Sequence, residues 1–213
     1  MSRYAAMFER LRARGEGAFG AFVMLGDPDP PASGRVLDAL VDGGADMIEV
    51  GIPFSDLIAN FRARHPQVPV GILTYANLVL APGRRDFFLR AAEAGADSLL
   101  VADLPLIEAE PWTREMRHAE LDPVLIAAGN TPDAALRKIA GLSGGYTYCV
   151  TRPGITGTHT QARFDPALID RLRHLGRARS HLGLTVARAL GDHGCRTGDA
   201  RRRGVAHRHR ARA

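Results

Sequence analysis

The sequence predicts an α/β fold built on a parallel β-sheet. Short apolar runs, typical of buried strands, alternate along the chain with segments in which apolar residues recur at helical spacing. Glycine, proline or an acidic residue follows most of these runs, as at turns. The chain has 213 residues, 46% of them hydrophobic and 24% charged, which are ordinary values for one globular domain. Strands that alternate with helices in this way predict a parallel sheet that closes into a barrel.

The start of the chain predicts a helix, a strand and a second helix. Ser2 can cap a short amphipathic helix at 2–14, and a strand follows at 18–25. The helix at 33–42 is expected to stop at the Gly43–Gly44 pair. The residues expected to face the core are Tyr4, Met7, Phe8 and Leu11 in the first helix and Val36, Leu37 and Leu40 in the second.

The second predicted strand, which begins at Asp46, carries a carboxylate within an apolar run. An ionised Glu49 is costly there unless it is paired, protonated or turned toward a polar cavity. Gly51 and Pro53 then end the strand and begin a loop. A carboxylate near the carboxyl end of a parallel strand lies where α/β barrels place their chemistry. Glu49 is therefore a candidate catalytic residue, and a salt-bridged structural glutamate is the alternative.

Regular strand–helix units fill the rest of the chain up to residue 175. Thr131 is expected to cap one of their helices. A glycine-rich loop at 152–158 precedes the last helix. Strands are expected at 70–75, 98–102, 124–127 and 146–151, and helices at 57–64, 84–94, 108–118, 132–140 and 166–175.

Beyond residue 175 the composition changes abruptly. Residues 171–213 hold twelve arginines and two aspartates, a net charge of +10, whereas the remaining residues hold 16 basic and 21 acidic residues, a net charge of −5. Such a tail buries too little apolar surface to offset the entropy lost on ordering. We therefore expect a partial β/α barrel at 1–175 and a largely disordered tail, rich in Arg, His and Gly, at 176–213. A change of reading frame near residue 176 would explain the switch, and translating the other frames of the gene tests this hypothesis.

Five stretches of the sequence carry a resemblance to a known family. In order, they are Leu25-Gly26-Asp27-Pro28, Glu49-Val50-Gly51-Ile52-Pro53-Phe54-Ser55-Asp56, Leu73-Thr74-Tyr75-Ala76-Asn77-Leu78, Leu100-Val101-Ala102-Asp103-Leu104-Pro105 and Gly145-Tyr146-Thr147-Tyr148. They resemble the tryptophan synthase alpha chain, over residues 1 to about 175. The resemblance implies a TIM (β/α)8 barrel that is incomplete here, with about six βα units recognisable and strands seven and eight replaced by the basic tail. It also implies that roughly 25–30 residues are missing after Asp56, a loss that agrees with the short length of the chain for such a barrel.

The activity implied by the resemblance is the cleavage of indole-3-glycerol phosphate to indole and glyceraldehyde 3-phosphate, a carbon–carbon lyase reaction of tryptophan biosynthesis. Glu49 would move the protons, whereas the family's second aspartate lies in the missing segment, so impaired activity is expected. The positions that match the family's indole pocket are Phe22, Leu100 and Tyr148, and those that match its phosphate contact and lid are Thr156 and Gly157. Core packing is the alternative for Phe22 and Leu100.

The resemblance also implies a partner, a beta chain that holds pyridoxal phosphate (PLP), in an α2β2 heterotetramer. Pro53 and Asp56 match positions at that contact, and no cofactor or metal is expected in this chain. Nucleic acid is not an expected partner, because no aromatic residues interleave with the arginines of the tail. Cys149 and Cys195 form no disulfide framework, and no apolar stretch or signal peptide points to a membrane, so a cytoplasmic protein is expected.

Two other functions remain open at the level of sequence. The retained Pro53 and Asp56 loop, beside the lost aspartate, favours an inactive alpha-like chain that binds or activates a beta chain. A barrel left open would expose strand edges, which favours a non-functional remnant that does not fold stably.

Overall fold

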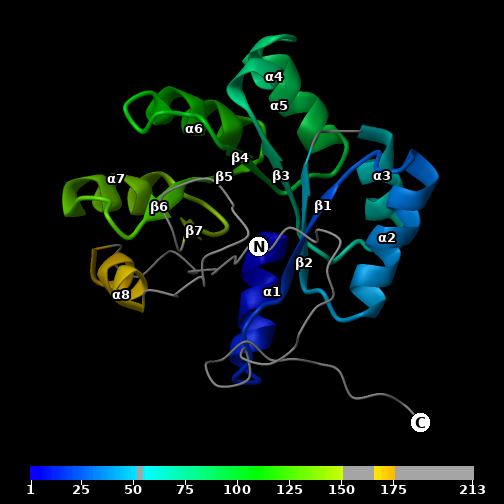
Figure 1. Ribbon diagram of the computed structural model, residues 1–213, viewed down its shortest axis with the longest axis horizontal. Helices are drawn as coiled ribbons and strands as arrows, with labels where there is room; N and C mark the ends of the chain where they lie inside the picture. The colour runs from blue at the N-terminus through cyan, green and yellow to red at the C-terminus, as the bar shows by residue number, and fades with distance from the viewer. Residues whose placement is uncertain (52–54, 151–165, 176–213) are drawn as a thin grey trace, which may run out of the picture.

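The structure is a computed structural model that describes residues 1–51, 55–150 and 166–175. It confirms the predicted α/β class: parallel strands form a curved sheet with helices along its outer side (Figure 1). The loop predicted at 152–158 and the tail at 176–213 lie outside the described residues. None of the described helices is long and apolar enough to cross a membrane.

The strands follow one another across the sheet in sequence order. Five of them pair in the order β1-β2-β3-β4-β5, and β6 pairs with β7, all in parallel. The strands are β1 (Gly20–Met24), β2 (Met47–Gly51), β3 (Val70–Thr74), β4 (Ser98–Val101), β5 (Asp122–Val124), β6 (Ile126–Ala128) and β7 (Tyr148–Val150). The helices are α1 (Arg3–Arg12), α2 (Pro30–Asp42), α3 (Ser55–Arg64), α4 (Ala76–Leu80), α5 (Arg84–Glu93), α6 (Ala109–His118), α7 (Asp133–Leu142) and α8 (Pro166–Leu175).

The strand predicted at 124–127 is divided in two, because its residues pair with different neighbours. The part before Leu125 pairs with β4, and the part after it pairs with β7. The Leu125 carbonyl accepts a hydrogen bond from the Tyr148 N–H group at 3.0 Å. Among the described residues no strand pairs with the outer edge of β1 or of β7, so the described barrel is partial.

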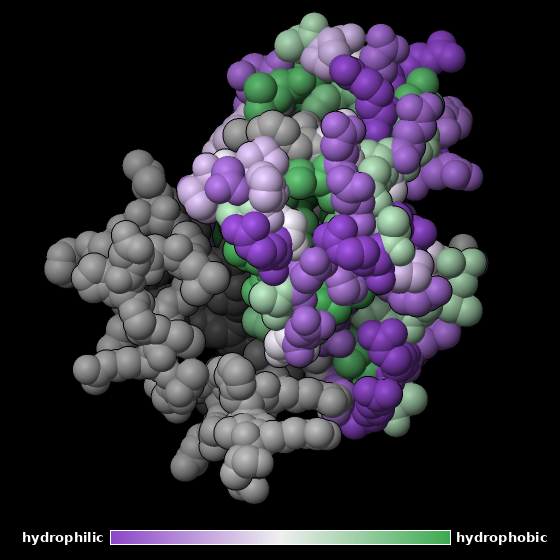
Figure 2. Space-filling view, turned by 90° about the vertical axis from the view of Figure 1, so that its right-hand side faces the viewer, coloured by the Kyte–Doolittle hydropathy of each residue, from purple (hydrophilic) through white to green (hydrophobic). Residues whose placement is uncertain are grey.

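Alternate residues of each strand face two different apolar layers. Outward-facing residues such as Ile48, Ile72 and Leu99 pack against the outer helices. Inward-facing residues such as Met47 and Leu100 pack with α1, as expected from the two-residue period of a strand. The outer surface is mostly hydrophilic with scattered hydrophobic residues on the side shown in Figure 2.

Helix α1 belongs to the inner layer. Its residues Tyr4, Met7 and Leu11 are buried there, beside the inward residues of the sheet. The predicted cap is confirmed, since the Ser2 hydroxyl accepts a hydrogen bond from the Ala5 N–H group at 3.3 Å. Its polar contacts reach Asp46, Pro66, Asp97 and Ser98, which precede or begin β2, β3 and β4, so the helix lies across the amino ends of these strands.

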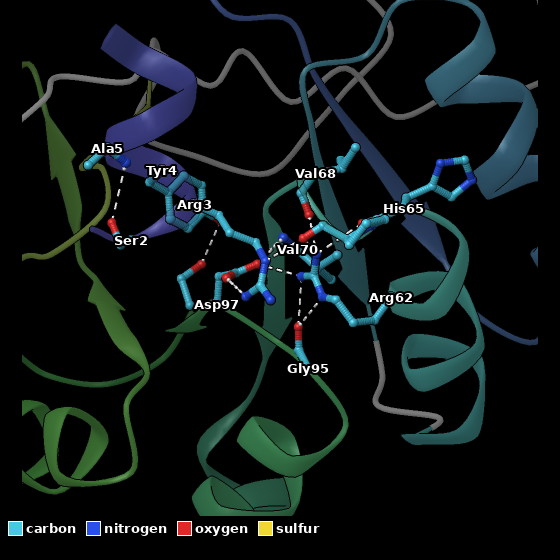
Figure 3. Close-up of polar contacts among 12 residues, drawn as sticks. Ser2, Arg3, Tyr4, Ala5, Arg62, His65, Val68, Val70, Gly95 and Asp97 are labelled. Carbon is cyan, nitrogen blue, oxygen red and sulfur yellow. Dashed lines mark hydrogen bonds and ion pairs between the residues drawn. The ribbon is translucent and has the colours of Figure 1, made fainter. Parts of the chain in front are cut away.

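The shortened connection between β2 and β3 still forms a crossover through α3. Ile58 and Phe61 bury one side of this helix in the outer layer. At its end Arg62 donates to the Gly95 and Val68 carbonyl groups and to Asp97, at 2.6 Å for the carboxylate (Figure 3). The other oxygen of Asp97 accepts from Arg3 of α1 at 2.8 Å. We call these three side chains, Arg3, Arg62 and Asp97, the arginine clamp; it ties α1, α3 and the start of β4 together.

Two local predictions are wrong, and one short helix was not predicted. Val36 is 41% exposed, because α2 turns Ala32, Ser33 and Leu37 inward instead. Thr131 does not cap α7: Pro132 stands at the cap position, and the Thr131 hydroxyl accepts from the Ala128 N–H group at 3.0 Å. The short helix α4 was not predicted, because five residues are too few for a periodic pattern.

Candidate active site

Glu49 lies on the inner face of β2 and is buried, with 1% of its surface exposed. The strand register sets Phe22 of β1 and Gly71 of β3 on either side of it. Inward-facing neighbours on the same strand are Met47 and Gly51, as strand alternation requires. The carboxylate therefore points into the enclosed side of the sheet, away from the layer of outer helices.

One oxygen of the Glu49 carboxylate has a partner and the other is open. The Tyr146 hydroxyl donates to Oε1 at 2.7 Å, whereas Oε2 is buried without a hydrogen-bond partner among the described residues. Burial raises the pKa of Glu49, and the Tyr146 hydrogen bond opposes this rise only in part. A carboxyl group with a raised pKa holds a proton more readily than an exposed glutamate, and its open oxygen is available for a ligand's proton.

A second phenol, that of Tyr4, lies beside Tyr146. The Tyr4 hydroxyl lies 2.9 Å from the Ser98 hydroxyl, and the Tyr4 and Tyr146 rings are 5.4 Å apart. Burial raises the pKa of both Tyr4 and Tyr146 well above the ordinary 10.0, so both remain neutral and can donate. Gly71 makes room for them: a Cβ atom there would lie 3.1 Å from the Tyr4 hydroxyl oxygen.

Two of the sequence-predicted site residues, Phe22 and Tyr148, lie near this carboxylate, and a third, Leu100, lies in the same inner layer. Phe22 faces Glu49 across the β1–β2 register, and Leu100 of β4 is buried in the inner layer. Burial and the negative charge of Glu49 raise the pKa of Tyr148 to about 12. The inner face of the sheet thus brings Glu49, Phe22, Leu100 and Tyr148 together from four strands.

The other predicted site residues are not part of this group. Asp56 is exposed in the first turn of α3. Pro53, Thr156 and Gly157 lie outside the described residues. The described residues contain no cluster of histidine, cysteine, aspartate and glutamate suited to a metal ion.

Sequence reasoning missed Tyr146 and Tyr4 as neighbours of Glu49. A signal for Tyr146 was present, because Tyr146 and Tyr148 are two residues apart and extended residues at that spacing share one face. Tyr4 carried no such signal, since its helical pattern indicated core packing alone.

Cys149 is buried, with 4% of its surface exposed, as expected of a small core residue.

The sequence profile of one family matches most of the chain. It is that of the tryptophan synthase alpha chain, and it matches residues 8–60 and 56–189. The match extends beyond residue 175, where the resemblance was expected to stop. Its two segments meet at residues 56–60, where the missing segment was expected.

Individual relatives agree with this match. The alpha chain of tryptophan synthase from Vibrio cholerae serotype O1 is 39% identical over 215 aligned positions, covering 88% of this chain and 80% of the relative. Because 88% of 213 residues is about 187, about 28 of those positions have no residue in this chain. The alpha chain from Klebsiella aerogenes is 40% identical and covers 76% of this chain and 70% of the relative.

Solved structures show the same fold. Tryptophan synthase from Mycobacterium tuberculosis superposes with a TM-score of 0.73 at 28% identity, covering 86% of this chain and 80% of the other. A chain of the tryptophan synthase α2β2 complex from Pyrococcus furiosus gives a TM-score of 0.58 at 32% identity, covering 63% of this chain and 66% of the other. The family match, the relatives and the partial barrel around Glu49 agree, and the chain belongs to the tryptophan synthase alpha chain family.

Proposed function

We propose that this chain cleaves indole-3-glycerol phosphate to indole and glyceraldehyde 3-phosphate, with Glu49 as the group that transfers protons. The observation that carries the proposal is the buried Glu49 carboxyl group, whose pKa is raised by burial and whose Oε2 atom has no described partner. A group that must both accept and donate a proton requires a pKa near the working pH.

The reaction breaks the bond between indole C3 and the first carbon of the glycerol chain. A proton leaves the hydroxyl group on that carbon, the hydroxyl carbon becomes an aldehyde, and the bonding electron pair passes to the indole ring. A proton delivered to indole C3 completes the balance. Glu49 can serve both steps in turn, while the Tyr146 hydroxyl holds one carboxylate oxygen at 2.7 Å and leaves the other for substrate.

Phe22, Leu100 and Tyr148 form the proposed wall for the indole ring. They come from β1, β4 and β7 on the inner face that also carries Glu49, and a wall of apolar and aromatic side chains suits a flat aromatic ligand. The proposed phosphate contacts, Thr156 and Gly157, rest on the family resemblance alone. The proposed boundary at residue 175, between the partial barrel and the basic tail, likewise rests on sequence.

Activity should be lower than in intact relatives, because a second carboxylate is missing. In the family pattern that aspartate follows the loop after Asp56, and the two segments of the family match meet there, at residues 56–60. A carboxylate beside the indole N–H group would stabilise positive charge developing on the ring. Loss of such a group typically reduces rate by roughly 10²–10⁴-fold.

A beta chain is the proposed partner, because the similar chain from Pyrococcus furiosus is part of a tryptophan synthase α2β2 complex. Tyr75, Leu78 and Ile107 follow the carboxyl ends of β3 and β4 and are 54%, 38% and 81% exposed, which suits a protein contact. Asp56, exposed on α3, and Pro53 are the other proposed contacts. In this proposal the beta chain holds PLP, and this chain holds no cofactor. The complex would work in the cytoplasm.

An inactive chain that only binds or activates a beta chain is the second candidate. The exposed Asp56 and the missing aspartate favour it. The test is indole release from indole-3-glycerol phosphate, with and without a beta chain, by the unchanged chain, Glu49→Gln and the matched control Glu110→Gln, which alters an exposed glutamate of α6.

Indole release that is lost in Glu49→Gln and retained in Glu110→Gln supports the proposed lyase activity. Equal release by all three chains refutes the role of Glu49. Stimulation of the beta chain without indole release selects the second candidate, and a non-cooperative thermal melt selects the unstable remnant.

A further inference from the structure

Gly51, the last residue of β2, has no room for a side chain because β1 fills the space in front of it. A Cβ atom on Gly51 would lie 2.3 Å from the Met24 sulfur and 3.0 Å from the Phe22 Cζ atom. Real Cβ atoms essentially never approach another atom to 2.3 Å, and 3.0 Å is tighter than most of their contacts. The side chains of Met24 and Phe22 therefore lie across Gly51.

This position is next to the Glu49 carboxylate. Side chains two residues apart on a strand leave the same face, so the missing Cβ of Gly51 and the side chain of Glu49 point the same way. The register pairs Phe22 with Glu49 and Met24 with Gly51. Met24 is thus one step closer than Phe22 to the carboxyl ends of the strands, the end at which barrels bind their ligands.

Met24 is exposed, unlike the other methionine of this face. It is 43% exposed, whereas Met47 at the opposite end of β2 is 2% exposed and belongs to the inner core. A methionine that only filled the core would be covered like Met47. Met24 instead remains partly exposed at the end of β1, with its sulfur in front of Gly51.

The chemistry of a thioether suits an aromatic ligand. Methionine is unbranched and has three rotatable bonds, so it can adapt its shape to a bound ring. Its sulfur and methyl group make favourable contacts with aromatic rings.

We propose that Met24 is a substrate-contacting residue that packs on the indole ring and, with Phe22, covers Glu49 when the substrate is bound. This inference rests on the proposed function, since it assigns Met24 to the same site. Met24 would then favour large aromatic ligands over small ones, and Gly51 would be required so that Met24 can lie across β2.

The test follows the methyl groups of methionine by NMR. The chain holds five methionines, at positions 1, 7, 24, 47 and 116, and 13C-methyl labelling gives one signal for each. The signal that disappears in Met24→Leu is that of Met24. Adding indole should move this signal through the ring current of the bound indole and should leave those of the buried Met47 and Met116 in place.

Kinetics provide the second measurement. Met24→Ala should raise KM for indole-3-glycerol phosphate by roughly 2- to 10-fold, with a smaller change in kcat, because an apolar contact to the ring is lost. Met24→Leu should restore most of the affinity. The matched control is Leu89→Ala, which truncates a side chain that is 41% exposed on α5 and should leave KM unchanged.

A Met24 signal that stays in place up to the solubility limit of indole would overturn the inference. So would an unchanged KM in Met24→Ala. The NMR result does not depend on turnover, so it separates this inference from the proposed reaction. A shifted Met24 signal in a chain that releases no indole would keep the binding role of Met24 and refute the reaction.

Discussion

Replacing Arg62 by methionine should destabilise the chain strongly, because the Arg62 side chain is largely buried and donates several hydrogen bonds. The Arg62 side chain is 13% exposed. It donates to the carbonyl groups of four residues and to Asp97 (Figure 3). Methionine keeps much of the apolar stem and removes the charge and all of these donors.

The expected loss follows from what Arg62 leaves behind. Removing one partner of a buried ion pair typically costs about 3–5 kcal/mol. Asp97, whose side chain is 8% exposed, retains Arg3 at 2.8 Å and the Val70 N–H group at 2.8 Å, so the loss should be near the lower end of this range. We expect the free energy of unfolding to fall by about 2–4 kcal/mol.

Arg64→Met is the matched control on the same helix. Arg64 pairs with Asp38 at 3.1 Å, but the two side chains are 44% and 36% exposed. Exposed ion pairs contribute about 0–1 kcal/mol.

The assay is denaturant unfolding monitored by circular dichroism, with the midpoints and slopes of the three chains compared. A loss below about 1 kcal/mol in Arg62→Met, or equal losses in the two variants, would refute the structural reasoning.

Three further predictions concern the site and the core. Tyr146→Phe removes the hydrogen bond that lowers the pKa of Glu49, so the limb of the pH–rate profile set by Glu49 should move to higher pH; an unchanged limb would contradict the geometry. Because burial raises the pKa of Glu49, the free energy of unfolding should fall as the pH rises from the ordinary glutamate pKa through the pKa of the folded chain. Unfolding curves at several pH values measure this decrease, and Glu49→Gln should remove the part of it that is due to Glu49. Burial raises the pKa of Cys149 to about 11, so in a Cys195→Ser background its reaction with a thiol reagent at pH 8 should be slow in the native chain and fast in denaturant; fast labelling of the native chain would show that Cys149 is accessible.

Local sequence patterns predicted most of the elements but not their exact partners. The periodic runs at 84–94 and 166–175 became α5 and α8 within a residue or so. The segment at 124–127 was predicted as one strand and forms parts of two, because its division depends on which neighbour each half pairs with. Val36 was placed inside and is exposed, because the rotation of α2 is set by the sheet beneath it.

The candidate site was predictable in part. Glu49 was identifiable because a carboxylate in an apolar strand is costly without a special environment. That environment was not identifiable, since Tyr146 is 97 residues away along the chain and Tyr4 is on a helix with an ordinary amphipathic pattern.

The sequence by itself determined the alternation of strands and helices, the strand that carries Glu49 and the family to which the chain is similar. These features depend on neighbouring residues and on short motifs. Only the tertiary structure decided that Tyr146 donates to Glu49, that Arg62 reaches Asp97 and that Met24 lies across Gly51. Each of these contacts joins different elements, and the physical reason is that strand order, register and helix rotation, which no local pattern encodes, bring their side chains within reach.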